Sequence, residues 1–339
     1  LRKRHNLNIQ QKAHVTRVIF RGKRAIGVEY IQKGQTKTVH ARAEIILSGG
    51  AINSPQLLQL SGIGPGKLLQ SHNINIVHVS HHVGKNLQDH LGSDIYYHAN
   101  VPTLNQELNP MFGKLRAGLK YIFTRKGPLS LSLNQGGGFI QIDPNASGPD
   151  LQLYFSPVSY TRAPAGVRPL MNPDPFPGFL MGFNPCKPTS VGNIQISSTD
   201  PMLPPKIYSN YLDTDYDKKM MIEGIRLIRR IANAPALNSI IKDELAPGVG
   251  IKSETDIAKY IRQKAWSVFH PCSTCRMGSN PNVSVVDPKL RVHGVDNLRV
   301  VDASIFPTIP TGNINAPSIM VGEYASDIIL KDARNQKGL

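Results

Sequence analysis

The sequence contains no run of about 18 apolar residues, so it predicts no membrane-spanning helix. It also lacks a charged and then apolar leader, since it opens with LRKRHNLNIQ and without an initiating methionine. Internal repeats and long polar tracts of low complexity are missing too, which leaves a globular protein of one large or two ordinary domains. The first residues lie beside a strand-like segment, so we expect a fragment or a processed chain.

Cysteine is scarce. The three cysteines among the 339 residues are Cys186, Cys272 and Cys275, which are too few and odd in number for a disulfide scaffold. This favours a reducing compartment. We expect a cytoplasmic protein, with a peripheral position at an inner membrane as the alternative.

Two of the cysteines belong to FHPCSTCRMG, residues 269–278, beside His270. A thioredoxin-type thiol pair lies where a strand meets the start of a helix, but Pro271 precedes Cys272 and no helical pattern follows. A zinc site needs four ligands, or three and a water, and the sequence has no second CxxC and no HxxxH. We therefore favour structural cysteines and predict no metal site. A CxxC thiol oxidoreductase stays an alternative.

Acidic residues are scarce in the first part of the chain. Residues 1–42 hold eleven lysines and arginines against Glu29 alone, a net charge of +10 out of +16 for the whole sequence. Such a charge suits a nucleic-acid surface, but these residues follow strand-like segments without the aromatic side chains on which bases stack. We favour a solvated face, or one that meets missing protein, and expect no nucleic acid. A basic module for nucleic acid or acidic surfaces is the alternative.

The first part of the chain predicts strands at 14–20, 25–31 and 36–41, joined by polar turns into an antiparallel meander. An apolar strand at 43–48 ends in two glycines, and a helix at 54–62 follows, with Ser54 as N-cap and Pro55 at its first position. A strand, a glycine turn and a helix in this order bring backbone N–H groups to a ligand. Residues 73–80 predict a further strand.

The middle of the chain predicts an antiparallel sheet in a separate lobe, with strands at 137–142, 150–160, 177–183 and 192–198. A proline-rich polar loop at 161–177 is placed to lie over a site. Helices are expected at 215–235, with core methionines Met220 and Met221, and at 253–266, capped by Ser253. A further helix at 113–127 gathers its apolar residues on one side, namely Leu115, Leu119, Ile122 and Phe123.

A buried strand at 298–304 is followed by the turn FPTIPTGNINAP and a helix from about Pro317 to Ala333. Asn313 and Asn315 stand just before this helix, whose N-terminal dipole favours an electron-rich group in the turn. A packed histidine and a simple N-cap explain His270 and Asn315 when each is taken alone.

Four stretches carry a combined signal. They are AEIILSGGAINSPQLLQLSGIGP (43–65), GKNLQDH (84–90), FHPCSTCRMG (269–278) and VVDPKLRVHGVDNLRVVDASIFPTIPTGNINAPSIMVGEYASDII (285–329). Together they resemble the glucose–methanol–choline (GMC) family of FAD-dependent oxidoreductases, and its choline-dehydrogenase-like members in particular. The matches run in the family's order from residue 15 to about 330, so the resemblance covers nearly the whole chain.

The resemblance implies roles for the matching residues. His270 corresponds to the acid/base catalyst that faces the flavin, and Asn315 to the second catalytic position. The implied reaction is oxidation of an alcohol, in which neutral His270 accepts the hydroxyl proton, Asn315 bonds the oxygen and the hydride goes to flavin N5. The implied FAD contacts are Val15, Ser48, Gly49, Gly50, Asp302, Ala303, Asn315, Ala316 and Pro317.

One landmark of the family is missing. The strand, GxGxxG and helix that hold the FAD pyrophosphate do not occur in this sequence. The resemblance therefore implies a C-terminal part of such an enzyme, and we expect the chain alone to bind FAD weakly or not at all and to be inactive.

The expected fold class is α+β with α/β character. An incomplete Rossmann-like FAD-binding domain takes residues 1–92 and 285–339, and a substrate-binding domain with an antiparallel sheet flanked by helices takes 93–284, with His270 at the interface. The expected substrate is choline or another small primary alcohol. The electron acceptor, the choice between oxidase and dehydrogenase, and a homo-oligomeric state stay open. Candidates for an aromatic cage around a quaternary ammonium are Tyr96, Tyr97, Tyr154, Phe155, Tyr160 and Trp266.

Overall fold

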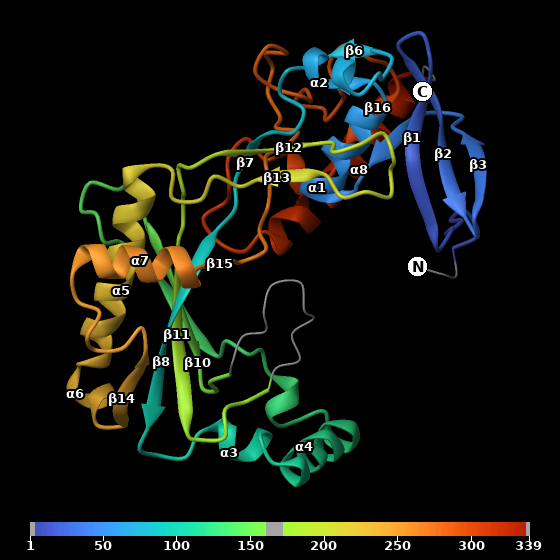
Figure 1. The fold of residues 1–339 in the computed structure, drawn as a ribbon. Coiled ribbons are helices and arrows are strands. Elements are labelled where there is room, and N and C mark those ends of the chain that lie inside the picture. The colour runs from blue at the N-terminus through green and yellow to red at the C-terminus, as the bar shows by residue number, and fades with distance from the viewer. Residues whose placement is uncertain (1–3, 161–171, 337–339) are drawn as a thin grey trace. The chain divides into compact units, whose positions relative to one another are not determined.

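The computed structural model describes residues 4–160 and 172–336. The chain divides into two compact units, each assembled from separate stretches (Figure 1). The first unit consists of Leu1–Asp89, Ser190–Tyr211 and Phe269–Leu339, and the second of His90–Thr189 and Leu212–Val268. Residues 190–211 and 269–284 thus belong to the first unit, although the predicted domains place them in the second. The FAD-binding and substrate-binding roles of the two units stay predictions.

The basic start of the chain forms the predicted meander. Strands β1 (Ala13–Arg21), β2 (Arg24–Gln32) and β3 (Gln35–His40) pair antiparallel in that order. The turn between β2 and β3 consists of Lys33 and Gly34, whose φ angles are 53° and 73°. Two consecutive positive φ angles are typical of a two-residue hairpin turn whose twist matches that of the strands it joins. The three predicted strands are confirmed.

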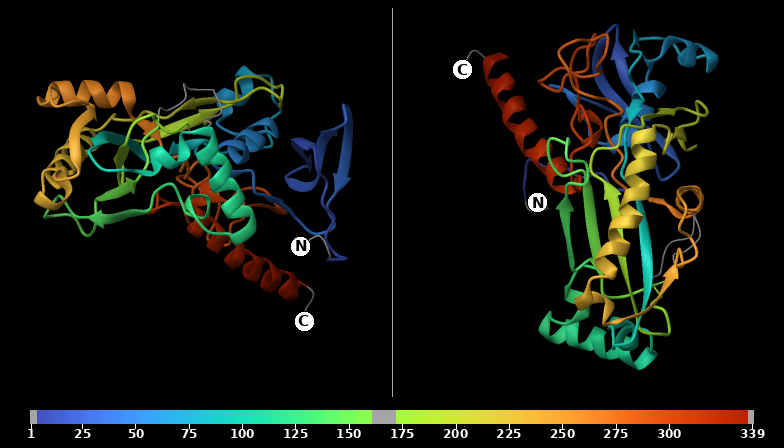
Figure 2. Two further views of the ribbon diagram at one scale, coloured as in Figure 1. Left: turned by 90° about the horizontal axis from the view of Figure 1, so that it is seen from below. Right: turned by 90° about the vertical axis from the view of Figure 1, so that its left-hand side faces the viewer.

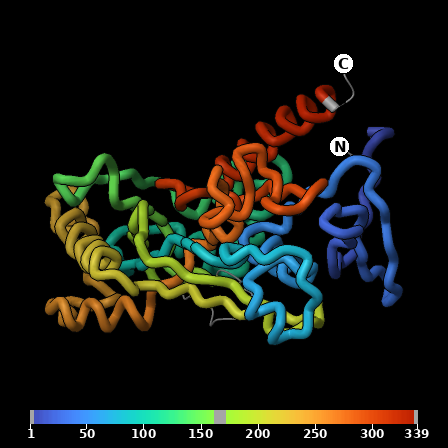
Figure 3. The backbone as a smooth tube through the Cα atoms, turned by 90° about the horizontal axis from the view of Figure 1, so that it is seen from above, coloured from blue at the N-terminus to red at the C-terminus, as the bar shows by residue number. Residues whose placement is uncertain are grey.

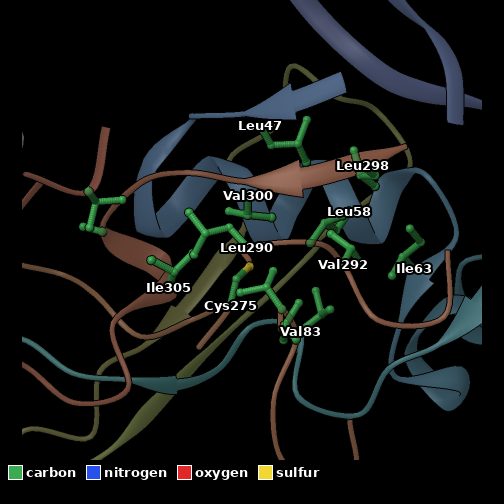
Figure 4. Close-up of a cluster of buried hydrophobic side chains, with 14 of the residues drawn as sticks. Leu47, Leu58, Ile63, Val83, Cys275, Leu290, Val292, Leu298, Val300 and Ile305 are labelled. Carbon is green, nitrogen blue, oxygen red and sulfur yellow. The ribbon is translucent and has the colours of Figure 1, made fainter. Parts of the chain in front are cut away.

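Two strands from distant parts of the sequence form the centre of the first unit. β4 (Ile45–Leu47) pairs in parallel with β16 (Leu298–Val300), and helix α1 (Gly50–Leu60) follows β4. Figure 4 shows side chains from all three elements in one cluster, among them Leu47, Val300 and Leu58. This buried cluster stabilises the pairing of the two strands, because a parallel pair is stable only when its apolar face is covered.

The predicted start of helix α1 is wrong. The helix begins at Gly50, so Ser54 and Pro55 lie inside it. Proline cannot donate the helical bond to the carbonyl of Ala51. That carbonyl instead accepts a hydrogen bond from Thr274 Oγ1 at 2.6 Å. A tertiary contact therefore satisfies the group that the proline leaves unpaired, and the helix continues through it.

Residues 73–80 form less strand than predicted. Only β6 (His78–Val79) forms a strand there, and it pairs in parallel with the equally short β5 (Ile63–Gly64). Because β5 has only two residues, the pairing of β5 with β6 is limited to two residues on each strand. Helix α2 (Gly66–Ser71) lies between them in the sequence.

The prediction that 192–198 joins the sheet of the middle lobe is wrong. Strand β12 (Gly192–Gln195) pairs with β7 (Lys85–Leu87) and β13 (Lys206–Tyr208) in the first unit. The side chain of Gln59 on α1 fixes it there, since Nε2 donates to the carbonyl of Ile194 at 3.1 Å and Oε1 accepts from the amide of Ile196 at 2.8 Å. A buried amide that bonds two backbone groups on one edge of the strand selects this location.

The second unit contains an antiparallel sheet in the order β14-β8-β11-β10-β9, with β15 paired to β8. The strands are β8 (Leu91–Ala99), β9 (Gly136–Ile140), β10 (Leu151–Ser156), β11 (Gly178–Pro185), β14 (Ile241–Ala246) and β15 (Trp266–Ser267). The antiparallel lobe is confirmed for three of its four predicted strands. Of the predicted loop at 161–177, residues 161–171 lie outside the described residues.

Helix α5 (Asp215–Ala232) packs along this sheet, as the right-hand view of Figure 2 shows. Its core residues Met220 and Met221 are buried, as predicted. Helix α5 lies very close to β11 at Gly224, where a Cβ would lie only 2.1 Å from the ring of Phe183. Helix α7 (Glu254–Lys264) begins as predicted, with Ser253 Oγ accepting from the amide of Asp256 at 3.1 Å.

The remaining helices of the second unit are short, except for α4. They are α3 (Leu104–Leu108), α4 (Met111–Thr124), the 3₁₀ turn η1 (Pro128–Ser130) and α6 (Pro235–Asn238). Helix α4 confirms the helix predicted at 113–127, but its apolar side is exposed to solvent.

In the first unit the turn η2 (Ala303–Ile305) leads to α8 (Asn315–Gln336), which begins two residues before the predicted start. Figure 3 shows α8 as a straight helix at the C-terminal end of the chain. Of the helices in the described ranges, none has the length and apolar content needed to cross a bilayer.

Candidate active site

The segment FHPCSTCRMG lies between two other parts of the first unit. On one side Cys272 and Gln88 exchange both of their backbone hydrogen bonds, at 2.9 and 3.2 Å. On the other side, the amides of Ser273 and Cys275 donate to the carbonyls of Ala303 and Ser304. These bonds hold the backbone around His270 firmly, and they explain why His270 belongs to the first unit.

His270 is 7% exposed. Its ring atom Nε2 lies 3.2 Å from Nδ2 of Asn313, and its backbone amide donates to Oδ1 of Asp89 at 2.8 Å. With Asn313 donating, Nε2 holds a lone pair and the ring proton is on Nδ1. Two residues far apart in the sequence thus fix the histidine from its ring and from its backbone.

Burial favours the neutral form of this histidine. Burial lowers the pKa of His270 below its ordinary value, and the Asp89 carboxylate offsets part of that effect by favouring the charged form. A neutral imidazole at neutral pH can accept a proton. Burial thus favours the form of the ring that a general base requires.

Asp89 is held in turn by a tyrosine. The hydroxyl of Tyr211 donates a short hydrogen bond to Oδ2, while Oδ1 accepts from the His270 amide. Sequence reasoning did not name Asp89, and it named Asn313 beside Asn315 without giving it a catalytic or binding role. Both had a signal, since Asp89 belongs to GKNLQDH and Asn313 stands in the same turn as Asn315.

The predicted residues Asn315, Ala316 and Pro317 form the first turn of α8. Asn315 is exposed. The ring of His270 has its hydrogen-bond contact from Asn313, two residues earlier. The structure thus brings His270 together with Asn313 rather than with Asn315, the predicted second catalytic residue.

Three predicted FAD contacts line one cavity of about 860 Å³ in the first unit, namely Val15, Ser48 and Gly49. Its walls come from β1, β4, α1 and the loop at 201–205, and they are largely apolar. Pockets that bind cofactors and drug-sized ligands are about 300–1,000 Å³ and mostly apolar. The size and lining of this cavity therefore fit part of a large cofactor such as FAD.

Two further predicted FAD contacts, Gly50 and Asp302, are bonded to each other. Oδ2 of Asp302 accepts from the amide of Gly50 at 2.9 Å and from Ser54 Oγ at 2.5 Å, while Oδ1 accepts from the amide of Ser304 at 2.8 Å. This carboxylate stabilises the start of α1, where the helix dipole favours negative charge. The Asp302 side chain therefore joins β16 to α1, and the buried Ala303 holds the histidine segment through its carbonyl.

Burial raises the pKa of the Cys272 thiol to about 12 and that of Cys275 well above its ordinary value. A nucleophilic thiol needs its thiolate form, so these thiols are poorly suited to redox chemistry. Figure 4 shows Cys275 among Leu290, Val83 and Ile305 in the apolar cluster. In residues 4–160 and 172–336 no three His, Cys, Asp or Glu side chains gather as a metal site requires.

Strand register separates the aromatic candidates. Tyr97 lies opposite Phe179 and stacks on it at a ring distance of 5.3 Å, and Phe155 lies 5.5 Å from the same ring. Tyr96 and Tyr154 point to the other face, because side chains alternate along a strand. The six candidates therefore do not form one cage.

Two sequence models described as GMC oxidoreductase match the chain, one over residues 1–92 and the other over residues 188–322. An alcohol dehydrogenase (acceptor) of Pseudomonas putida is 42% identical, and the match covers 97% of this chain and 59% of that protein. The mitochondrial choline dehydrogenase of Homo sapiens is 41% identical, with 96% and 54% covered. The chain thus spans a little over half the length of these curated relatives.

Solved structures agree with this result. A formate oxidase of Aspergillus oryzae RIB40, studied for FAD modification, superimposes with a TM-score of 0.87 at 27% identity, over 95% of this chain and 60% of that one. The mixed α/β architecture with antiparallel sheets and helices is therefore shared. On the sequence and structural matches together, this chain belongs to the GMC oxidoreductase family, a family of FAD-binding flavoproteins.

Proposed function

We propose that the polypeptide carrying this chain is an FAD-dependent alcohol oxidoreductase, with His270 as general base and Asn313 as the residue that bonds the substrate oxygen. One observation carries the proposal: Nε2 of a buried His270 lies 3.2 Å from the amide of Asn313. A base and a hydrogen-bond donor side by side are what removal of a hydroxyl proton requires.

His270 removes the proton in this proposal. An alcohol hydroxyl that donates to Nε2 replaces the bond from Asn313, and it leaves the amide of Asn313 to donate to the alcohol oxygen. The oxygen becomes more negative as its proton leaves, so this hydrogen bond strengthens as the reaction proceeds. FAD, when bound, supplies the acceptor for the hydride.

Asp89 positions the base. Its carboxylate bonds the His270 amide and Tyr211 holds the carboxylate from the other side. The negative charge also stabilises the imidazolium that forms after proton transfer. The backbone pairing of Cys272 with Gln88 restricts movement of the same segment.

The cavity lined by Val15, Ser48 and Gly49 supports FAD as the cofactor. We further propose that this chain provides only part of the FAD site. The sequence has no GxGxxG to hold the pyrophosphate, and the chain matches 59% of the length of its Pseudomonas putida relative. The isolated chain is then a weak flavin binder without activity of its own.

We propose choline or another small primary alcohol as the substrate. The names of the relatives, alcohol dehydrogenase and choline dehydrogenase, support this class. Tyr96 and Tyr154 share one face of the sheet of the second unit and are the better pair for contact with a cationic head. The thiol oxidoreductase loses support, because burial raises the pKa of both thiols.

The test uses the longest polypeptide that carries this chain. Its flavin absorbance is measured, and choline, an uncharged isostere and short primary alcohols are screened with a dye acceptor and with oxygen. Alcohol turnover by a flavin-bearing protein supports the proposal, while bound flavin without turnover of any of these alcohols contradicts the substrate class. The purified 339-residue chain should hold flavin far below one per chain, and stoichiometric flavin would show that its FAD site is complete.

A further inference from the structure

Helix α4 faces the protein with its smallest residues. Ala117 is 1% exposed. A Cβ at Gly113 would lie 1.9 Å from the carbonyl oxygen of Glu107, so only glycine fits where α4 meets α3. The close contact fixes which side of α4 points inward, and the exposure of the other side is therefore a property of the fold.

The outward side of α4 carries large apolar residues. Each is between 46% and 81% exposed, and they are Met111, Phe112, Leu115, Leu119, Ile122 and Phe123. At 3.6 residues per turn they occupy an arc of about 120° on the helix. The turn η1 packs next to α4, and there Leu129 and Leu131 are 51% and 60% exposed. Soluble surfaces carry single apolar residues, but a contiguous patch marks an interaction site.

Positive charge borders this apolar arc. Five cations and no acid lie between Pro110 and Gly127, namely Lys114, Arg116, Lys120, Arg125 and Lys126. On the helical projection Arg116 and Lys120 lie on one side of the arc and Lys114 on the other. None of these cations forms an ion pair with any residue in the described part of the chain.

The contacts these cations do make leave their charge available. Lys114 Nζ donates to the neutral amide of Asn172 at 3.4 Å, and the Arg125 guanidinium lies 5.2 Å from the ring centre of Tyr121. A neutral partner does not cancel the charge. The surface therefore presents an apolar strip with uncompensated cations on both of its borders.

We propose that α4 and η1 dock on an anionic lipid surface, with the apolar arc inserted at the level of the headgroups and the lysines and arginines on the lipid phosphates. A helix with an apolar face between basic borders lies in the plane of a membrane interface in this way. Each cation near an anionic leaflet adds attraction on top of the burial of apolar area. The inference is independent of the proposed catalysis, since the docking needs no flavin.

The positive charge around α4 also favours an anionic lipid surface over a second copy of the chain as its binding partner. A symmetric contact through α4 places the same residues of both copies face to face. It would bring two sets of five cations together without an acid between them, and this repulsion opposes the contact. An anionic bilayer satisfies the apolar arc and the charge at once.

Flotation with vesicles tests the docking. The chain is mixed with vesicles of phosphatidylcholine alone and with vesicles that contain phosphatidylglycerol, at low and high salt. We expect binding to the anionic vesicles that weakens as salt rises. Phe112→Ser with Phe123→Ser, and separately Arg116→Glu with Lys120→Glu, should each lower the partition coefficient about tenfold or more, given the contribution of each cation and each buried apolar group.

Matched variants act as controls on the same unit. Lys252→Glu with Lys259→Glu reverses two exposed cations outside α4, and Val249→Ser removes an exposed apolar side chain. These should bind like the unchanged chain. The exposed positions of all variants leave the fold intact, which circular dichroism and the Tm verify.

Three results would overturn the proposal. The first is no binding to anionic vesicles, and the second is binding that the α4 variants and the control variants reduce equally. The third is that this chain binds vesicles but the longest polypeptide that carries it does not. In that case other parts of the polypeptide cover the apolar side of α4. A dimer in sedimentation velocity that the α4 variants dissociate, without vesicle binding, would assign the face to a second copy.

Discussion

Nδ2 of Asn313 lies 3.2 Å from Nε2 of His270, while Asn315 begins helix α8 two residues later. The turn TGNIN offers two asparagines of the same chemistry, and the tertiary structure brings the first of them to the histidine. In a helix start, residues two apart point in different directions. This relationship gives the first prediction.

Asn313→Ala should lower kcat of the alcohol oxidation by about 10²-fold, as loss of one hydrogen-bond donor to a developing negative oxygen does. Asn315→Ala, the matched control in the same turn, should change kcat less than about threefold. Both are measured by steady-state kinetics on the flavin-bearing polypeptide. The reverse order of effects would return the second catalytic role to Asn315.

His270→Gln should lower kcat by about 10²–10⁴-fold, because the reaction loses its general base. Flavin absorbance should stay unchanged, since the bonds that hold the segment come from backbone groups of Cys272, Ser273 and Cys275. Near-normal turnover would remove His270 from the mechanism, and loss of flavin would assign it a binding role instead.

Asp89→Asn should move the acidic limb of the pH profile of kcat/KM to lower pH. The Asp89 charge raises the pKa of His270, so its removal lowers that pKa further, and the neutral base persists in more acid solution. Tyr211→Phe keeps the charge and should leave the limb near its original position. An acidic limb that moves upward with Asp89→Asn would contradict this electrostatic role.

Stability should fall as the solution is made acidic below about pH 6.5. Burial lowers the pKa of His78, His82 and His270 below the ordinary value of 6.5. The unfolded chain therefore binds protons first, and the stability held above pH 6.5 is lost as pH falls through the folded-state values. Urea midpoints between pH 8 and 5 measure this slope, and His78→Gln should make it shallower. A slope that is equally steep in the variant would exclude His78 as a contributor.

Arg299→Ala should destabilise the first unit by about 3 kcal/mol or more, because it leaves carboxylates without their buried partner. Arg299 is 4% exposed and bonds Glu44 at 2.7 Å and Asp332 at 2.9 Å, which joins β16 to α8. Arg291→Ala removes a half-exposed partner of Asp287 and should cost less than about 1 kcal/mol. Equal urea midpoints for the two variants would show that burial adds nothing to the Arg299 pairs.

Local patterns predicted several elements correctly. The meander of β1, β2 and β3 follows from alternation and turn residues, and α5 and α7 follow from apolar spacing and from the side chain of Ser253. These signals act between residues close in sequence, so the sequence carries them in readable form. The predicted role of His270 depended on the four-stretch resemblance, and it stays a prediction.

The errors came from contacts distant in sequence. Pro55 is a helix-start signal by itself, but Thr274 bonds the carbonyl that the proline leaves unpaired, so α1 begins at Gly50. The segment 192–198 has an ordinary strand pattern, but Gln59 and β7 place it in the first unit. A strand pattern states that a segment is extended and does not identify its partner.

The sequence by itself determined the family motifs, the basic charge of the first strands, the scarcity of cysteine and most helices and strands, because each of these depends on neighbours along the chain. Tertiary structure alone decided which asparagine meets His270, that Asp89 and Tyr211 support the same segment, and that the apolar side of α4 faces outward. These relationships join residues that are distant in the sequence, and packing and hydrogen bonding in the folded chain fix them.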